Sequence, residues 1–544
     1  MTSVPDRAWL AGALLVVLAW TVVLAGPGLF GAHDLPAGAF HTGHAFFAWH
    51  LGTVPAGGDL SHPPFGWPGS PSVQLIGWVP LAVGAVAQGL GPLRAYSVAL
   101  VVGPLLTALA TWGWLGRLDR TPGPARALGV VAFCTCSFAV AALGNGQLAK
   151  LQLWVLPAAL WGVAALREAP SVGRALVLLT MVVAGVFSAP SLAVQLPVAA
   201  VAQVLVRDPG LRPLVPKKLS TAVGALAIVA VGLLPGALFM AGADDAGTRP
   251  AVAGTGTRVG GAAPSASLDD LLLGLGARAD GLDAVNHAPV VGGLALVVAL
   301  VMARRAGPKR RTGLVLLLVG AVLALGPMLT WGTEPVTVGG WTIALPAAVL
   351  TALHYPMGET GQWYRFVVVA SLGLAALLAR ARSPRALGVV GVAVVLGALQ
   401  AVHQSGHPFP RDAVLVPAAA SMARLRTGGP PGAVVVLPLI ASTVDGGPGL
   451  AMGALSGRHT SAMARHTEGH PATVELRAVL QRVHAARTPE AAKRLLAEAG
   501  VAVVVWRPGA TVMRGEVWLD VAAVEADLGP PQLDGEAAVW WTDG

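Results

Sequence analysis

An acidic residue and a group of histidines follow the first apolar run of the chain. The stretch GLFGAHDLPAGAFHTGHAFFAWH, from Gly28 to His50, places Asp34 among four imidazoles, and Asp59 and His62 follow shortly after. Carboxylate and imidazole groups move protons in catalysis, and together they bind divalent cations. The histidines that precede and follow Asp34 most closely are His33, His41 and His44.

Two kinds of site are consistent with this group. His41 and His44 share one face if residues 38–51 are helical, so with Asp34 they offer ligands for a divalent cation. No HExxH or CxxC motif accompanies them, so no cofactor is firmly expected, and the histidines can also donate directly to a phosphate without a metal.

Purely structural roles are equally available to these residues. Asp34 has the properties of a turn residue or a helix cap before the sequence LPAG. The histidines can lie on a surface helix whose aromatic residues anchor it at a membrane interface. Those aromatic residues are Phe40, Phe46, Phe47 and Trp49.

The composition shows which kind of protein must position these residues. The chain has 544 residues, of which 55% are hydrophobic and only 12% charged. Many apolar runs approach the roughly 20 residues that cross a bilayer. The sequence therefore predicts an α-helical polytopic membrane protein. The net charge is +9, and the Lys and Arg residues lie mainly in short loops between the apolar runs. This distribution is typical of the residues that orient a protein in the membrane, so no nucleic-acid partner is expected.

About eleven transmembrane helices are predicted, with basic loops between them in the cytoplasm. The basic loops are RLDRTPGPAR (117–126), REAPSVGR (167–174), RDPGLRPLVPKK (207–218), RRAGPKRR (304–311) and RARSPR (380–385). The predicted spans are 8–30, 95–116, 127–143, 150–167, 174–188, 190–206, 219–241, 289–303, 312–331, 363–380 and 386–402.

The apolar run at 72–90 decides the topology. If it crossed the membrane, the first basic loop would face outward, so we expect a surface or re-entrant helix there. The N-terminus is then cytoplasmic, and outer loops lie at about 31–94, 242–288 and 332–362. Within the third loop, the apolar stretch 341–353 is too short to span comfortably.

The sequence changes character from about residue 404. GAVVVLPL (432–439), VAVVVW (501–506) and AAVWWTD (537–543) read as buried strands, whereas 471–486 and 489–500 have helical spacing, the latter ending at a capping glycine. We therefore divide the chain into a transmembrane domain, 1–403, and a small C-terminal α/β domain outside the cytoplasm, 404–544.

The order of these features resembles the GT-C superfamily of integral membrane glycosyltransferases. The likeness begins with one span followed by a long outer loop that carries an acid, in GAHD. It continues in HPPFGWPGSPS, in LGPLRAYSVAL, in GNGQLAKLQLWVLPAALWG, in GQWYRF before a late span, and in the terminal strand GVAVVVW. The likeness covers most of the chain in layout and rests on short motifs.

This resemblance implies a GT-C-like fold and a function. Such proteins take a sugar from a polyprenyl-phosphate carrier and transfer it to a glycan, lipid or protein acceptor on the outer side of the cell (inner or plasma) membrane. By position, Asp34 matches the acid of the first outer loop, which would act as the base.

The residues themselves indicate where the lipid phosphate would be bound, because outward-facing cations are scarce in this sequence. Arg365, with Tyr364 next to it, is the best candidate, and Lys150 after GNGQ is a further one. Arg249, Arg258 and Arg278 in the second outer loop are alternatives, and Arg365 also fits an interfacial anchor at the start of a span. Glu359 in the third loop is a candidate second acid.

The residues expected to bind substrate are His33, His41, His44, Asp59, His62, Lys150, Glu359, Tyr364 and Arg365. The interpretation has two rivals of other classes. A polytopic lipid or sugar transporter shows polar residues at mid-membrane, and few charges lie in these spans. The second rival is a non-catalytic GT-C-like membrane protein that serves in envelope assembly.

Overall fold

The computed structural model divides into two compact units. The described residues of Met1–Leu24, Leu100–Gly144 and Leu148–Pro410 form the helical unit. Those of Ala25–Ala99, Asn145–Gln147 and Arg411–Gly544 form the second unit. The structure describes residues 5–29, 34–36, 86, 89–90, 92–119, 123–146, 148, 150–206, 216–245, 268, 271, 293–305, 311–331, 334–353, 363–404, 413–415, 418–439, 449–450, 452–453, 455–462, 471–507 and 517–542.

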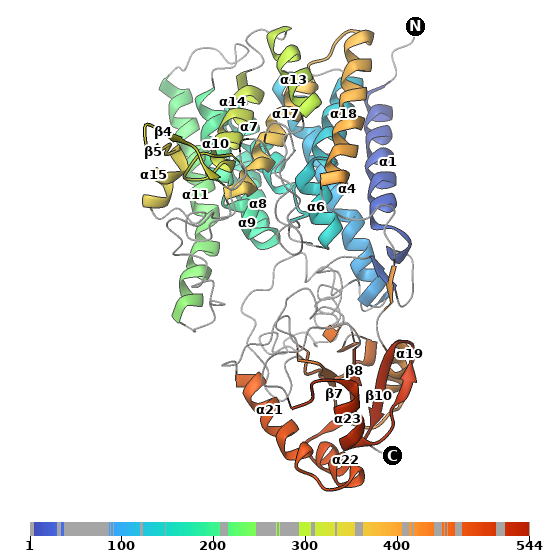
Figure 1. Ribbon diagram of the computed structural model, residues 1–544. Helices are drawn as coiled ribbons and strands as arrows, with labels where there is room; N and C mark the ends of the chain where they lie inside the picture. Colours follow the sequence, from blue (N-terminus) through green and yellow to red (C-terminus); the bar gives the residue numbers. More distant parts are fainter. Residues whose placement is uncertain are drawn as a thin grey trace. The chain divides into compact units, whose positions relative to one another are not determined.

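The helical unit is built mainly of apolar helices, most of them roughly parallel or antiparallel to one another (Figure 1). Their bounds are α1 (Asp6–Ala25), α4 (Pro92–Asp119), α5 (Gly123–Cys134), α6 (Ser137–Asn145), α7 (Val155–Glu168), α8 (Val172–Ser188), α9 (Pro190–Ala193), α10 (Leu196–Leu205), α11 (Pro216–Asp245), α13 (Gly293–Arg305), α14 (Arg311–Ala324), α15 (Pro346–Ala352), α17 (Val367–Leu378) and α18 (Pro384–Gln404). A 3₁₀ turn, η4 (Trp363–Phe366), precedes α17.

Among the described helices, three are long and apolar enough to cross a membrane: Asp6–Ala25, Arg94–Leu118 and Pro384–His403. The pair α5 and α6, bent by 48°, makes a fourth if it is one span. Further apolar helices have 10–17 described residues, which is shorter than the roughly 20 of a straight crossing. The chain is thus a helical membrane protein, and the number of eleven spans stays a prediction.

Several predicted spans are interrupted in the structure. The span predicted at 127–143 bends near Thr135, whose hydroxyl and backbone N–H both donate to the Val131 carbonyl at 2.9 Å, and a hydroxyl that back-bonds in this way often bends a helix. The span predicted at 190–206 is two helices, and α10 restarts with a proline in its first turn. The span predicted at 150–167 begins as helix only at Val155.

The span predicted at 312–331 ends early. Helix α14 stops at Ala324, and Gly326 adopts a φ of 75°, followed at once by Pro327. Glycine in the left-handed region and a following proline both end a helix. The remaining residues enter a short strand, β2 (Thr330–Trp331), so this part of the prediction is wrong.

Close packing of α14 against α17 fixes the segment that carries η4. A Cβ added at Gly320 would meet the backbone of Ala370, and one added at Gly373 would meet the backbone of Leu317. Small residues let membrane helices approach this closely. Residues of η4 are correspondingly buried, with Trp363 and Phe366 stacked at 5.9 Å between ring centroids.

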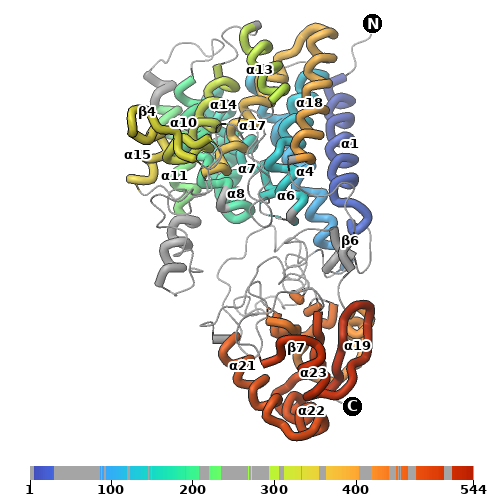
Figure 2. Tube along the Cα trace, viewed as in Figure 1, coloured from blue at the N-terminus to red at the C-terminus, as the bar shows by residue number. Residues whose placement is uncertain are grey.

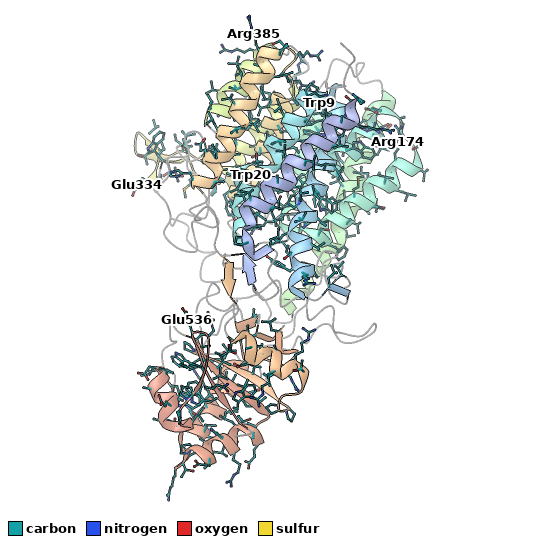
Figure 3. All side chains as sticks on the ribbon, turned by 90° about the vertical axis from the view of Figure 1, so that its right-hand side faces the viewer. Trp9, Trp20, Arg174, Glu334, Arg385 and Glu536 are labelled. Carbon is teal, nitrogen blue, oxygen red and sulfur yellow. The ribbon has the colours of Figure 1, made fainter. Side chains whose placement is uncertain are left out.

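Contacts near several basic loops gather at one end of the helical unit. A Cβ at Gly123 would touch Asp6 and Trp9, so the start of α5 lies beside the start of α1. Arg117 pairs with Glu168, and Arg167 donates to the Gln203 carbonyl at 2.8 Å. Figure 3 shows Trp9 and Arg385 toward this end, with Trp20 further along α1.

The same contacts make α1 and α4 antiparallel. The end of α1 and the start of α4 therefore lie at the opposite end of these helices from the basic loops. The run at 72–90 falls almost wholly outside the described residues, so the surface or re-entrant helix stays a prediction. The side of the membrane on which the basic end lies is likewise a prediction.

The second unit contains a four-stranded mixed sheet of order β7-β8-β10-β9. Strands β7 (Ala433–Leu437) and β8 (Val501–Trp506) are parallel, and β10 (Ala537–Trp541) is antiparallel to both β8 and β9 (Gln532–Asp534). Three of these strands coincide with those predicted from sequence. The predicted capping glycine, Gly500, has a φ of 80° directly after α22.

Helices α19 (Ala419–Thr427), α21 (Pro471–His484), α22 (Pro489–Glu498) and α23 (Val521–Leu528) accompany the sheet (Figure 2). Leu480, Leu496 and Val524 pack with the strand residues Val504 and Trp540 into one apolar core. A separate two-stranded sheet joins β1 (Asp34–Pro36) to β6 (Ala413–Leu415). Its pairing links two chain segments that lie far apart in the sequence. The domain boundary at 404 stays a prediction.

Candidate functional site

Lys150 lies in a turn segment that the structure places between α6 and α7. Leu151 donates to the Leu148 carbonyl at 3.2 Å, and Val155 donates to Gln152 at 3.2 Å. The buried side chain of Gln152 fixes the turn, because its amide donates to the Leu148 carbonyl at 3.0 Å and accepts from the Trp154 indole at 2.9 Å. Lys150 is therefore held outside the helices, half-buried.

Gln152, Trp154 and Gly103 are supporting residues that the sequence analysis did not single out. A Cβ at Gly103 on α4 would come within 3.0 Å of the Gln152 amide nitrogen and 3.3 Å of the Leu151 carbonyl. Glycine at this position thus lets the turn pack against α4. The polar run GNGQLAKLQ before an apolar helix was the available signal, and it led only to Lys150.

Tyr364 and Arg365 come from η4, directly before α17. Tyr364 is buried, with 3% of its surface exposed, and Arg365 is half-buried. Because Trp363 and Phe366 on the same turn are fully enclosed, the turn presents Tyr364 and Arg365 from a rigid base. The predicted span at 363–380 therefore begins with this 3₁₀ turn.

The structure brings Lys150, Tyr364 and Arg365 together. Lys150 Nζ donates to Tyr364 Oη at 3.3 Å, and Arg365 Nε lies 3.5 Å from the same oxygen. Both cations also lie near the tyrosine ring, at 5.8 Å and 5.9 Å from its centroid. We call these three residues the cation cluster.

The cation cluster has the electrostatics of an anion site. Burial, together with the smaller effect of the positive charge on Arg365, lowers the pKa of Lys150 to about 7. Two like charges that share one phenol oxygen repel each other, so an anion between them would relieve that repulsion. Arginine and lysine are the side chains that bind phosphate most often.

Asp34 is the first residue of strand β1, which follows α1 after a short 3₁₀ turn, η1 (Pro27–Leu29). Its Cα pairs with Leu415 of β6. Residues that follow a helix cap enter a helix, whereas Asp34–Pro36 are extended, so the capping alternative is wrong. The backbone pairing gives this residue a fixed place in the second unit.

The remaining predicted site residues lie outside the described part of the chain. They are His33, His41, His44, Asp59, His62 and Glu359. Within the described residues, no group of three or more His, Cys, Asp or Glu side chains is arranged to hold a metal ion. The divalent cation expected at Asp34, His41 and His44 therefore stays a prediction.

No protein-family model matches the sequence, and no curated protein matches it either. Solved structures do match the fold. ArnT from Cupriavidus metallidurans, bound to undecaprenyl phosphate, superposes with a TM-score of 0.53 at 13% identity, over 98% of this chain and 97% of that one.

Two other solved structures are similar over most of this chain. The Archaeoglobus fulgidus oligosaccharyltransferase in its apo form gives a TM-score of 0.52 at 11% identity, over 92% of this chain and 69% of that one. The arabinofuranosyltransferase AftD from mycobacteria gives 0.50 at 17% identity, over 94% of this chain but 36% of that one. These neighbours are glycosyltransferases of the GT-C superfamily, and at such identities the likeness establishes that this membrane protein shares their fold.

Proposed function

We propose that the protein is a membrane glycosyltransferase that moves a sugar from a polyprenyl-phosphate carrier to an acceptor on the non-cytoplasmic face. The observation that supports this most is the cation cluster, within a chain that has the GT-C fold. Two cations around one phenol suit the phosphate of a lipid-linked sugar. The solved ArnT structure contains undecaprenyl phosphate, a ligand of this chemical class.

The reaction needs a base for the acceptor, and we assign that role to Asp34. Its carboxylate takes the proton of an acceptor hydroxyl as the oxygen attacks the anomeric carbon of the sugar. The bond between that carbon and the phosphate oxygen breaks, and its electron pair leaves with the phosphate. The products are the glycosylated acceptor, polyprenyl phosphate and a protonated Asp34.

The cation cluster acts on the leaving group. The donor is a phosphodiester with one negative charge, whereas the departing phosphate monoester gains a second as the bond breaks. Lys150 and Arg365 therefore bind the departing phosphate more tightly than the donor, which lowers the barrier. The Tyr364 hydroxyl, which accepts from Lys150, can direct its own proton toward the same phosphate.

His33, His41, His44, Asp59, His62 and Glu359 complete the proposal as residues of the outer loops that contact the donor and acceptor. A divalent cation on Asp34, His41 and His44 is the alternative means of balancing phosphate charge. The acceptor is a glycan, lipid or protein of the cell envelope, and the enzyme lies in the cell membrane with its N-terminus cytoplasmic.

Transfer in membranes tests the proposal. Membranes with and without the protein are supplied with radiolabelled polyprenyl-phosphate sugars, each in the presence and absence of a chelator. We expect label to move into envelope material only with the protein. Movement of intact lipid-linked sugar across the bilayer without transfer would indicate a transporter. No protein-dependent change of either kind would indicate a non-catalytic assembly protein.

A further inference from the structure

Three short extended segments after α14 pair with one another in a closed ring. Leu329 N donates to the Ile343 carbonyl at 3.0 Å, Val336 N to Leu329 at 2.9 Å, and Ile343 N to Val336 at 3.2 Å. Each segment thus donates to one neighbour and accepts from the other. The paired strands are β2 with β3 (Glu334–Pro335) and β4 (Thr337–Val338) with β5 (Trp341–Thr342), and a bridge joins Met328 to Ala344.

The ring has a tight turn at one corner. Gly339 and Gly340 have φ values of 59° and 83°, which suit a two-residue hairpin turn that only glycine adopts freely. Helix α15 follows the ring directly, starting at Pro346. We call the described residues of 327–353, which are 327–331 and 334–353, the interfacial segment. In Figure 1, β4, β5 and α15 project from the side of the helical unit.

The interfacial segment exposes large apolar side chains. Trp341 is 82% exposed, and Trp331 is 55% exposed. Val338, Val349 and Leu353 are each more than 60% exposed. Between Thr312 and Leu353 the sequence has a single charged residue, Glu334. Such a surface is unfavourable in water, and exposed apolar patches of this kind are typically covered by lipid or by another protein.

The features of the interfacial segment favour lipid as the covering phase. Backbone placed in an apolar phase must satisfy its own hydrogen bonds, and the closed ring pairs the central residue of all three segments. Tryptophan is enriched where a bilayer meets water. The segment also continues directly from α14, an apolar helix whose Leu318 is 53% exposed on its outer face.

We propose that the interfacial segment inserts into the bilayer interface and anchors the protein in the leaflet opposite the basic loops. The choice of leaflet rests on the topology of the proposed function, because α14 starts at the basic loop 304–311. Insertion would also affect the position of the cation cluster in the membrane. Helix α14 packs against both α15 and η4, so an anchor at 327–353 would hold Tyr364 and Arg365 at a fixed depth beside lipid headgroups.

Site-specific fluorescence tests the insertion. The full chain, with Cys134 and Cys136 replaced by alanine, carries one new cysteine, Val338→Cys or Trp341→Cys, labelled with an environment-sensitive dye. Leu533→Cys is the matched control, because Leu533 is a 74% exposed apolar residue on strand β9. Each protein is placed in nanodiscs, with quenchers either aqueous (iodide) or lipid-bound (nitroxide near the headgroup end of an acyl chain).

At positions 338 and 341 we expect emission shifted to the blue, strong quenching by the nitroxide lipid and weak quenching by iodide. The control should show the reverse. Iodide quenching at 338 and 341 as strong as at 533 would overturn the proposal. Protection from both quenchers would overturn it as well, and would indicate a protein partner or a second copy. Because the measurement needs no sugar transfer, its failure is distinguishable from failure of the proposed function.

Discussion

The ammonium nitrogen of Lys150 lies 3.3 Å from the phenol oxygen of Tyr364, although the two residues are 214 positions apart in the chain. Lys150 comes from a turn that Gln152 fixes, and Tyr364 from a turn that is buried beneath α14. Arg365 approaches the same oxygen at 3.5 Å. Helix packing, and no local sequence feature, therefore creates the cation cluster.

Removal of either cation should weaken sugar transfer. Lys150→Gln or Arg365→Gln deletes one charged contact to phosphate, a kind of contact worth about 1.5–3 kcal/mol, so kcat/KM for the donor should fall about 10- to 100-fold. Tyr364→Phe keeps the ring and should cost less. Arg482→Gln on the exposed face of α21 is the control and should match wild type. Equal rates for Lys150→Gln and this control would remove Lys150 from the site.

The enzyme should bind its lipid-linked donor more weakly as the pH rises through neutrality. Burial lowers the pKa of Lys150 to about 7, so this lysine is charged below that pH and neutral above it. The phosphodiester keeps its charge throughout this range, so kcat/KM for the donor should decline above pH 7, up to about tenfold per pH unit. Lys150→Arg keeps its proton and should abolish the decline. An unchanged profile in Lys150→Arg would assign the titration to another group.

The two ends of the protein should lie on opposite sides of the membrane. Because basic loops face the cytoplasm, we expect the N-terminus inside and the C-terminal region outside. A reporter enzyme that works only after export, fused after residue 420, should be active. A second fusion, within the basic loop 167–174, should be inactive. Export activity at the loop together with none at 420 would invert the topology.

The C-terminal sheet should not tolerate charge at its centre. Val503 is fully buried in β8 between β7 and β10, so Val503→Lys leaves a charge without solvent, at a cost of several kcal/mol. Residues after 430 should then become sensitive to protease. Val474→Lys, at a half-exposed position of α21, is the matched control and should stay resistant. Equal resistance of the two variants would contradict the strand register.

The sequence predicted the helices and the buried strands because their signals are local. Long apolar runs and blocks such as VAVVVW indicate buried segments directly, and Gly500 indicates where α22 ends. The sequence analysis did not predict the ring at 328–345. Residues 312–331 carry no charge and were interpreted as one continuous span, although α14 ends just before Gly326 and Pro327. Those two residues were the available signal.

The site was predictable only in part for a related reason. Arg365 and Lys150 stood out as rare cations beside apolar runs, but nothing local indicates that one phenol lies between them. Likewise, three residues are too few for a strand pattern, so the pairing of Asp34 with Leu415 depends on contacts across the whole chain. Resemblance in layout supplied the role of Asp34, which stays a prediction.

The most direct test of the account separates donor binding from transfer in one purified preparation. Wild type, Asp34→Asn and the double variant Lys150→Gln/Arg365→Gln are compared in nanodiscs for retention of a radiolabelled polyprenyl-phosphate sugar and for its transfer to acceptor. Asp34→Asn keeps the shape of the side chain, so it should bind donor like wild type while transfer falls about 10²- to 10⁴-fold, the worth of a positioned base. The double variant should lose both. Transfer at the wild-type rate by a correctly inserted Asp34→Asn protein would contradict the mechanism.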